Sequence, residues 1–90
     1  MKYIRIYVGA EDIKKGRPNQ GNSCPIARAI KRYTGTARPN VDGGTCRIRK
    51  AGKLLKFNLP KTAQAFITQF DWHNPVQPFS FRLTPKLKVA

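Results

Sequence analysis

Acidic residues are scarce in this chain. Four Asp and Glu residues stand against 18 Lys and Arg residues among 90, and the formal net charge at pH 7 is +14. Such an imbalance costs self-repulsion in the compact state and creates attraction toward polyanions. The charge therefore predicts a nucleic acid as the partner, and it leaves DNA and RNA equally open.

Long apolar runs are also missing. No stretch of about 18 apolar residues exists to cross a membrane, and Arg5 and Glu11 interrupt any apolar block near the N-terminus. We therefore expect a cytoplasmic protein without a membrane partner. Cysteine is limited to Cys24 and Cys46, and without an export signal free, buried thiols are the better prediction.

Groups that carry catalysis or bind metal are few. His73 is the single histidine, and the two cysteines are far apart in sequence, whereas a structural zinc site needs four ligands at close spacings. We expect no metal, no cofactor and no enzymatic activity. A thiol enzyme remains an alternative, with Cys24 activated at a helix start near Arg28 and His73 acting as its base.

What the sequence does contain is clear hydrophobic periodicity. Alternation predicts strands at residues 2–8, 45–50, 53–59 and 79–84, with a short extended segment near 37–41. Apolar spacings of three and four predict helices at 24–33, with Ser23 as N-cap and Tyr33 on the apolar face, and from Pro60 through Phe70. Residues 9–22 are predicted to form a long loop, with a helical turn near 11–14.

These elements predict an α+β fold. We expect one two-layer domain over residues 1–84, in which a mostly antiparallel sheet of about four strands carries two helices on one face, and a short basic tail at 85–90. The aromatic-rich segment 66–83 contributes Phe66, Phe70, Phe79 and Phe81 to the core. Its Asp71-Trp72-His73-Asn74 stretch should end a helix, with Asp71 or Asn74 bonding backbone groups near Pro75.

The sheet face opposite the helices is the first candidate site. Aromatic rings among guanidinium and ammonium groups suit single-stranded nucleic acid, because bases stack on rings while cations neutralise phosphates. Exposed strands also favour Tyr and Arg for their β-propensity alone, so a purely structural explanation stays open. The predicted residues of this face are Tyr3, Arg5, Tyr7, Arg47, Arg49, Lys56 and Arg82.

A second basic group covers the long loop and the first helix. Cations in this region could grip phosphates, although a solvated helix face beside a loop would have the same composition. The residues of this group are Lys14, Lys15, Arg17, Arg28, Lys31 and Arg32.

Two segments resemble a known group of proteins. The residues CPIARAIKR at 24–32 and FDWHNPVQPFSFRL at 70–83 are similar to small proteins of tailed bacteriophages and prophages with no established function. The resemblance implies a phage origin and action in the host cytoplasm, and it transfers no catalytic residue. It leaves two hypotheses: a non-enzymatic nucleic-acid-binding protein of low sequence specificity, or an inhibitor that binds a host protein complex.

Overall fold

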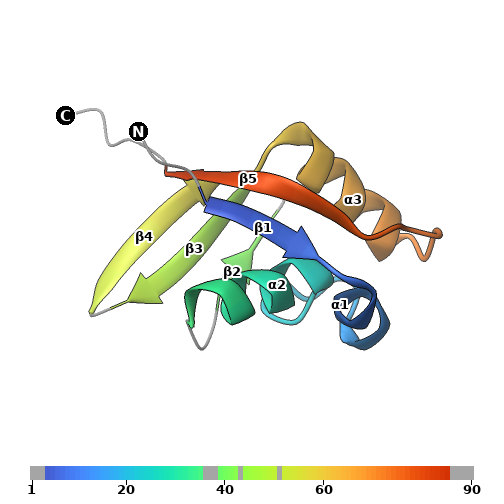
Figure 1. Cartoon of the computed structure of the whole chain (residues 1–90), viewed down its shortest axis with the longest axis horizontal. Helices are drawn as coiled ribbons and strands as arrows, with labels where there is room; N and C mark the ends of the chain where they lie inside the picture. The colour runs from blue at the N-terminus through green and yellow to red at the C-terminus, as the bar shows by residue number, and fades with distance from the viewer. Residues whose placement is uncertain (1–3, 36–38, 43, 51, 86–90) are drawn as a thin grey trace.

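The predicted α+β fold is confirmed. A computed structural model describes residues 4–35, 39–42, 44–50 and 52–85, and Figure 1 shows a sheet accompanied by helices. The elements are β1 (Ile4–Val8), α1 (Ala10–Lys15), α2 (Pro25–Thr34), β2 (Asn40–Val41), β3 (Thr45–Lys50), β4 (Lys53–Asn58), α3 (Lys61–Asp71) and β5 (Phe79–Pro85). Pro85, which the sequence placed in the tail, belongs to β5.

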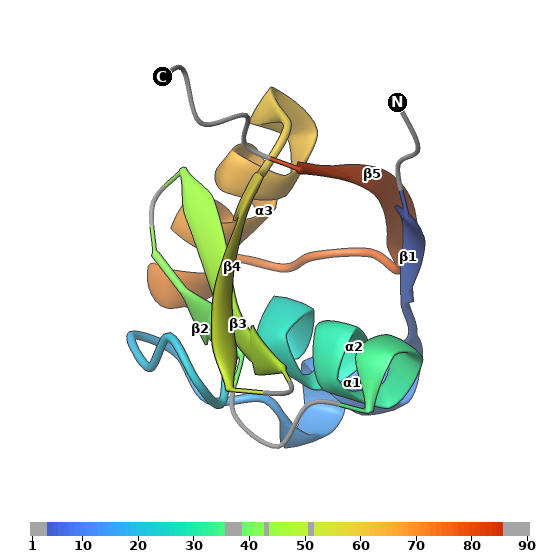
Figure 2. The ribbon, with the colours of Figure 1, turned by 90° about the vertical axis from the view of Figure 1, so that its left-hand side faces the viewer.

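The five strands form one sheet in the order β1-β5-β4-β3-β2, and every neighbouring pair is antiparallel. β1 pairs with β5 along its whole length, as β3 does with β4. By contrast, β4 and β5 pair only at Phe57↔Pro85 and Asn58↔Thr84. This short junction allows the sheet to curl. Figure 2 shows β1 and β5 on one side of the molecule, β3 and β4 on the other, and α2 between them.

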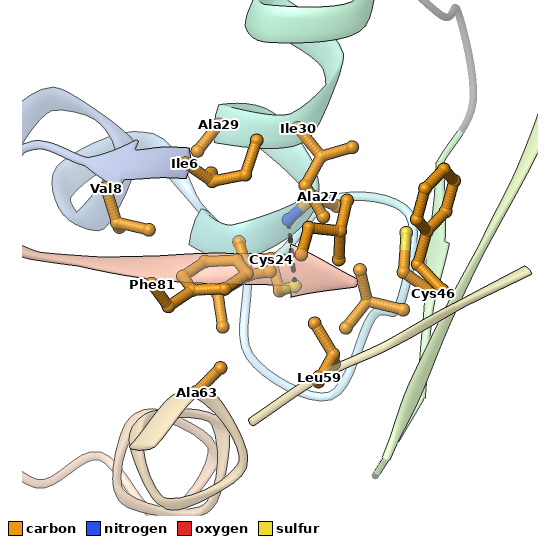
Figure 3. Close-up of a cluster of buried hydrophobic side chains, with 14 of the residues drawn as sticks. Ile6, Val8, Cys24, Ala27, Ala29, Ile30, Cys46, Leu59, Ala63 and Phe81 are labelled. Carbon is orange, nitrogen blue, oxygen red and sulfur yellow. Dashed lines mark hydrogen bonds between the residues drawn. The ribbon is translucent and has the colours of Figure 1, made fainter. Parts of the chain in front are cut away.

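The core fills the inside of this curl (Figure 3). Ile6 and Val8 of β1 are fully buried, as are Ile26 and Ile30 of α2. Burying an aliphatic side chain of this size contributes about 1.5–3 kcal/mol, so this cluster is the main stabilising contact between helix and sheet. The other buried apolar residues of the core include Ala27, Ala29, Val41, Cys46, Ile48, Phe57, Leu59, Ala63, Phe66, Phe81 and Leu83.

Helix α2 begins one residue later than expected. Cys24, not Ser23, is the N-cap: its Sγ accepts a hydrogen bond from the backbone N–H of Ala27 at 3.4 Å. Ser23 belongs to the preceding turn, where its N–H donates to Gln20 O. The predicted burial of Tyr33 is also wrong. Its side chain lies in the last turn of α2, beside the open end of the curl, and is 60% exposed.

The aromatic segment joins α3 to β5. The Phe66 ring stacks on Phe79 at a centroid distance of 4.7 Å, and Phe79 stacks on Phe81 at 5.6 Å. Phe66 and Phe81 are buried, and Phe70 and Phe79 are half-buried against the core. The predicted architectural role of these rings is confirmed.

Helix α3 ends by a different mechanism from the predicted one. His73 adopts a left-handed conformation with φ of 62°, its N–H donates to Phe70 O, and Asn74 N–H donates to Gln69 O. This pattern is a Schellman motif. Asp71 does not bond the backbone near Pro75: its Oδ1 accepts from the N–H of Asn19 at 2.8 Å and ties the long loop to α3. Among the helices of the described residues, none has the length and apolarity to cross a membrane.

Candidate nucleic-acid interface

The outer surface of β1 and β5 carries part of the predicted site. Arg5 lies directly opposite Arg82 in the strand register, and Tyr7 lies opposite Ser80. Arg5 Nη1 donates a long hydrogen bond of 3.5 Å to Ser80 Oγ. The Tyr7 side chain is 56% exposed. This surface therefore presents two guanidinium groups next to an accessible ring. Tyr3 lies outside the described residues.

The outer surface of β3 and β4 carries the other predicted strand residues. Arg47 lies opposite Lys56, and Arg49 lies opposite Leu54. Arg47 has a partner, since its Nη2 is 3.6 Å from Asp42 Oδ2. The hydrogen bond from the Thr45 side chain is the main reason that the pKa of Asp42 lies below its usual value, and Arg47 adds to this effect.

The curl separates these two surfaces. Both belong to the convex face of one sheet, and their strand residues are exposed. Figure 2 shows β1 and β5 on the opposite side of the molecule from β3 and β4. A straight ligand cannot lie across both at once. The one flat face expected from the alternation is thus two surfaces, here called the β1–β5 surface (Arg5, Tyr7, Arg82) and the β3–β4 surface (Arg47, Arg49, Lys56).

Aromatic stacking has less support than the charge. Among the described residues, Tyr7 is the one aromatic side chain that points outward from the strands; the phenylalanines of β4 and β5 point into the curl. One stacked base contributes about 1–3 kcal/mol. Binding at either surface would therefore depend mainly on phosphate contacts.

The loop-helix group is organised around a carboxylate that the sequence analysis did not single out. Asp12 of α1 is only 1% exposed. Arg32 binds it with two hydrogen bonds, Nη1 to Oδ1 at 2.7 Å and Nη2 to Oδ2 at 2.8 Å. Arg32 Nη2 also donates to Tyr7 O at 3.0 Å, and the Gly9 N–H donates to Asp12 Oδ2 at 3.0 Å. This bidentate pair fixes α1, α2 and β1 to one another.

The charge state of Asp12 follows from these contacts. Burial alone would raise the pKa of its carboxyl group. The hydrogen bonds from Arg32 and Gly9, together with the positive charges of Arg32 and Arg28, outweigh burial and hold the pKa below its usual value. Asp12 is therefore ionised at neutral pH. The guanidinium group of Arg32 is held by this internal ion pair and is only partly accessible to a ligand.

Three cations nevertheless line a hollow on α2. Arg28, Lys31 and Arg32, with Gly35, surround a concavity of about 370 Å³. Arg28 Nε is buried and lies 3.7 Å from Asp12 Oδ1, and it has no hydrogen-bond partner among the described residues. The hollow adjoins β1, because Arg32 binds Tyr7 O. It can accept an anionic group.

The remaining basic residues lie on α1 and on the loop after it. Lys14, Lys15 and Arg17 are exposed, and Lys15 Nζ lies 3.5 Å from Glu11 Oε2 in an exposed pair of the kind that contributes little. They add to the positive field beside α2 without forming a defined pocket.

Both thiols are free and buried. Burial raises the pKa of Cys24, and burial is also the main reason that the pKa of Cys46 is raised to about 12. Cys24 lines a concavity of about 430 Å³ with Asp71 and Trp72, but its Sγ already accepts the N-cap hydrogen bond. His73 is exposed beyond the end of α3. Across the described residues, no group of three or more His, Cys, Asp or Glu side chains could hold a metal ion.

The structural pairing of Asp12 with Arg32 was not predicted from the sequence. Asp12 stands three residues after Gly9, at the third position of α1, where an acidic side chain commonly bonds back to the helix start. That signal was readable. The second signal is the spacing of Arg28 and Arg32, which lie one helical turn apart on α2. These arginines reach Asp12 only because α2 packs on α1.

The chain was compared with protein families, curated proteins and solved structures. No family model, no curated protein and no solved structure matches the chain. We therefore infer a function from the charges and contacts of the described residues.

Proposed function

We propose that this protein binds nucleic acid without catalysing a reaction and with little sequence specificity. The β1–β5 surface and the neighbouring α2 hollow form the primary contact, and the β3–β4 surface forms a second one. Action in the cytoplasm of a bacterial host is part of the same proposal, on the strength of the sequence resemblance.

One observation carries this proposal. Cations stand directly opposite each other across strands at Arg5↔Arg82 and again at Arg47↔Lys56. Directly opposed like charges on a sheet are destabilising by about 0.2–1 kcal/mol. A phosphate between the members of each pair would be attracted by both cations, and at Arg47 it would compete with Asp42, whose Oδ2 lies 3.6 Å from Arg47 Nη2. Base-specific readout has no comparable support, because no carboxylate and few amides accompany the cations on the β1–β5 surface.

Fluorescence anisotropy with labelled single- and double-stranded DNA and RNA, over a range of salt concentrations, tests the proposal. We expect the logarithm of the binding constant to fall linearly with the logarithm of salt concentration. The double variant Arg5→Gln/Arg82→Gln should lower the slope on single strands by about 0.7, since the pair is proposed to neutralise one phosphate and each phosphate contributes about 0.7.

Lys61→Gln is the matched control, because Lys61 is exposed at the start of α3, outside both surfaces. It should leave the slope nearly unchanged. An absence of binding at low salt, or equal slopes for the control and the double variant, would refute the proposed contact.

A further inference from the structure

Within the described residues, one edge of strand β4 is paired only at its C-terminal end. The strand pairs with β3 from Lys53 to Asn58, but with β5 only at Phe57 and Asn58. Residues 53–56 therefore have no strand neighbour on their second side within the described part of the chain. Such an edge presents free N–H and C=O groups and is a template for another extended chain.

An apolar groove runs beside this edge. Its volume is about 310 Å³, and its lining residues come from β1, the last turn of α2, β3 and β4. Of the five large hydrophobic side chains described as exposed, three belong to this region: Tyr33 at 60%, Leu54 at 50% and Leu55 at 39%. The residues that line the groove are Ile4, Tyr33, Thr34, Ile48, Leu55 and Phe57.

The geometry of the β4 edge favours an extended segment as the ligand of the groove. Leu55 and Phe57 face the groove, whereas Leu54 and Lys56 face outward. A strand added to the β4 edge would place alternate side chains in the groove and the others beside Leu54 and Lys56. A helix could fill the groove, but it would leave the backbone edge unpaired.

Charge selects the composition of the occupant. None of the groove residues is acidic. Lys56 is exposed on β4, and Arg47 and Arg49 are exposed on β3, so the outward side of an added strand would meet cations. A second copy of β4 would bring another Lys56 to this position, which like-charge repulsion opposes.

We propose that the β4 edge and its groove bind an extended segment of a partner protein with alternating apolar and acidic side chains. The segment pairs by strand addition, with apolar residues in the groove and acidic residues next to Lys56. This inference shares Lys56 with the β3–β4 surface, but it also requires the backbone edge and the apolar contacts of β4, which nucleic-acid binding does not use.

The probe is a fluorescein-labelled peptide of about seven residues that alternates valine and glutamate. We expect saturable binding to the full-length protein, weakened at least tenfold by Leu55→Asn and unaffected by Trp72→Ala, which removes an exposed ring elsewhere. A peptide of identical composition with paired valines and glutamates tests non-specific attraction and should bind at least tenfold more weakly.

Two further comparisons test the pairing itself. One peptide carries N-methyl groups on its valines and a second carries them on its glutamates. Only one of these two sets of backbone N–H groups faces the β4 edge, so we expect methylation to abolish binding in one peptide and not in the other. Lys56→Glu should reverse the preference in favour of a valine–lysine peptide. Equal binding by both methylated peptides, or by the paired-residue peptide, would overturn the proposal.

Other occupants give distinct results. If removal of residues 86–90 creates peptide binding that the full chain lacks, the groove belongs to the chain's own C-terminus and the proposal fails. If sedimentation shows a dimer that Leu55→Asn dissociates, the occupant is a second copy and the proposal also fails. Leu55→Asn should bind oligonucleotides with unchanged affinity. This result would show that the variant loses peptide binding through the groove and keeps the nucleic-acid surface intact.

Discussion

At the scale of single residues, Asp12 holds three structural elements together. It is a buried carboxylate in a chain of net charge +14, and it joins three elements through Arg32 and Gly9. The arginine that the charge pattern assigned to phosphate binding is thereby committed to an internal contact. A strongly basic protein retains this acid because removing it would leave two neighbouring guanidinium groups without compensation.

The first prediction concerns Asp12→Asn. The amide cannot replace the bidentate ionic pair, so we expect the free energy of unfolding at pH 7 to fall by about 2–3 kcal/mol. Urea denaturation followed by circular dichroism measures this change. Glu11→Gln is the control, since its exposed pair with Lys15 should contribute less than about 0.5 kcal/mol.

The same carboxylate predicts a pH dependence. Because the pKa of Asp12 is lower in the folded protein, its contribution is fully present above the unfolded pKa of about 4 and is lost as pH falls through the folded value. Wild-type stability should therefore decline in acid more steeply than that of Asp12→Asn. Parallel declines in the two proteins would show that Asp12 is not the titrating group.

Thiol reactivity gives another test at this scale. Burial raises the pKa of both thiols, Cys46 to about 12, so little thiolate exists at pH 8. We expect a disulfide reagent to label Cys24 and Cys46 in the folded protein far more slowly than in urea. Rapid labelling of Cys24 in the native state would instead favour the thiol-enzyme alternative.

At the scale of elements, the long loop is anchored rather than loose. Gly21 O accepts the N–H of Val41 at 2.7 Å, and Asn19 N–H binds Asp71. The loop therefore connects β2 to α3, two elements that are distant in sequence. A Cβ at Gly21 would collide with the Val41 carbonyl oxygen, so the close approach requires glycine.

Gly21→Ala should consequently destabilise the fold by about 1–3 kcal/mol, as overpacking does. Thermal unfolding compared with Gly44→Ala tests this, because the nearest atom to a Cβ at Gly44 is the Gln64 amide nitrogen at 3.9 Å. Equal melting temperatures for the two variants would mean that the loop shifts freely away from β2.

At the scale of the whole molecule, net charge acts on stability and, under the proposed function, on binding. Eighteen cations on one small domain repel one another, and added salt screens that repulsion. The curl places the β1–β5 strand pair and the β3–β4 strand pair, with their exposed cations, on opposite sides of the molecule (Figure 2). If the protein binds phosphates as proposed, the same cations that repel one another in the free protein would attract the ligand.

The prediction for the whole molecule is that stability and binding change in opposite directions. Arg5→Gln should raise the free energy of unfolding at low salt by about 0.2–1 kcal/mol, by relieving the repulsion from Arg82, and should weaken oligonucleotide binding. At about 1 M salt, where screening acts within about 3 Å, the stability gain should vanish. A gain that persists at high salt would indicate improved packing instead of relieved repulsion.

Local periodicity identified most of the elements and most of the residues that they bury, with Tyr33 as an exception. Alternation and spacings of three and four identified the strands at 45–50 and 79–84, the two longer helices and the buried positions Ile6, Ile30 and Phe81. These patterns depend on which side of one strand or helix meets the core, and that information lies within a few neighbouring residues.

Only the tertiary structure decided how those faces are arranged. The two-residue junction between β4 and β5 produces the curl that divides the outer cations into two surfaces and opens the groove beside Leu55. The packing of α1 on α2 brings Asp12 to Arg32, 20 residues away. Strand register and helix docking arise from contacts between distant segments, and the pattern of any one segment does not contain them.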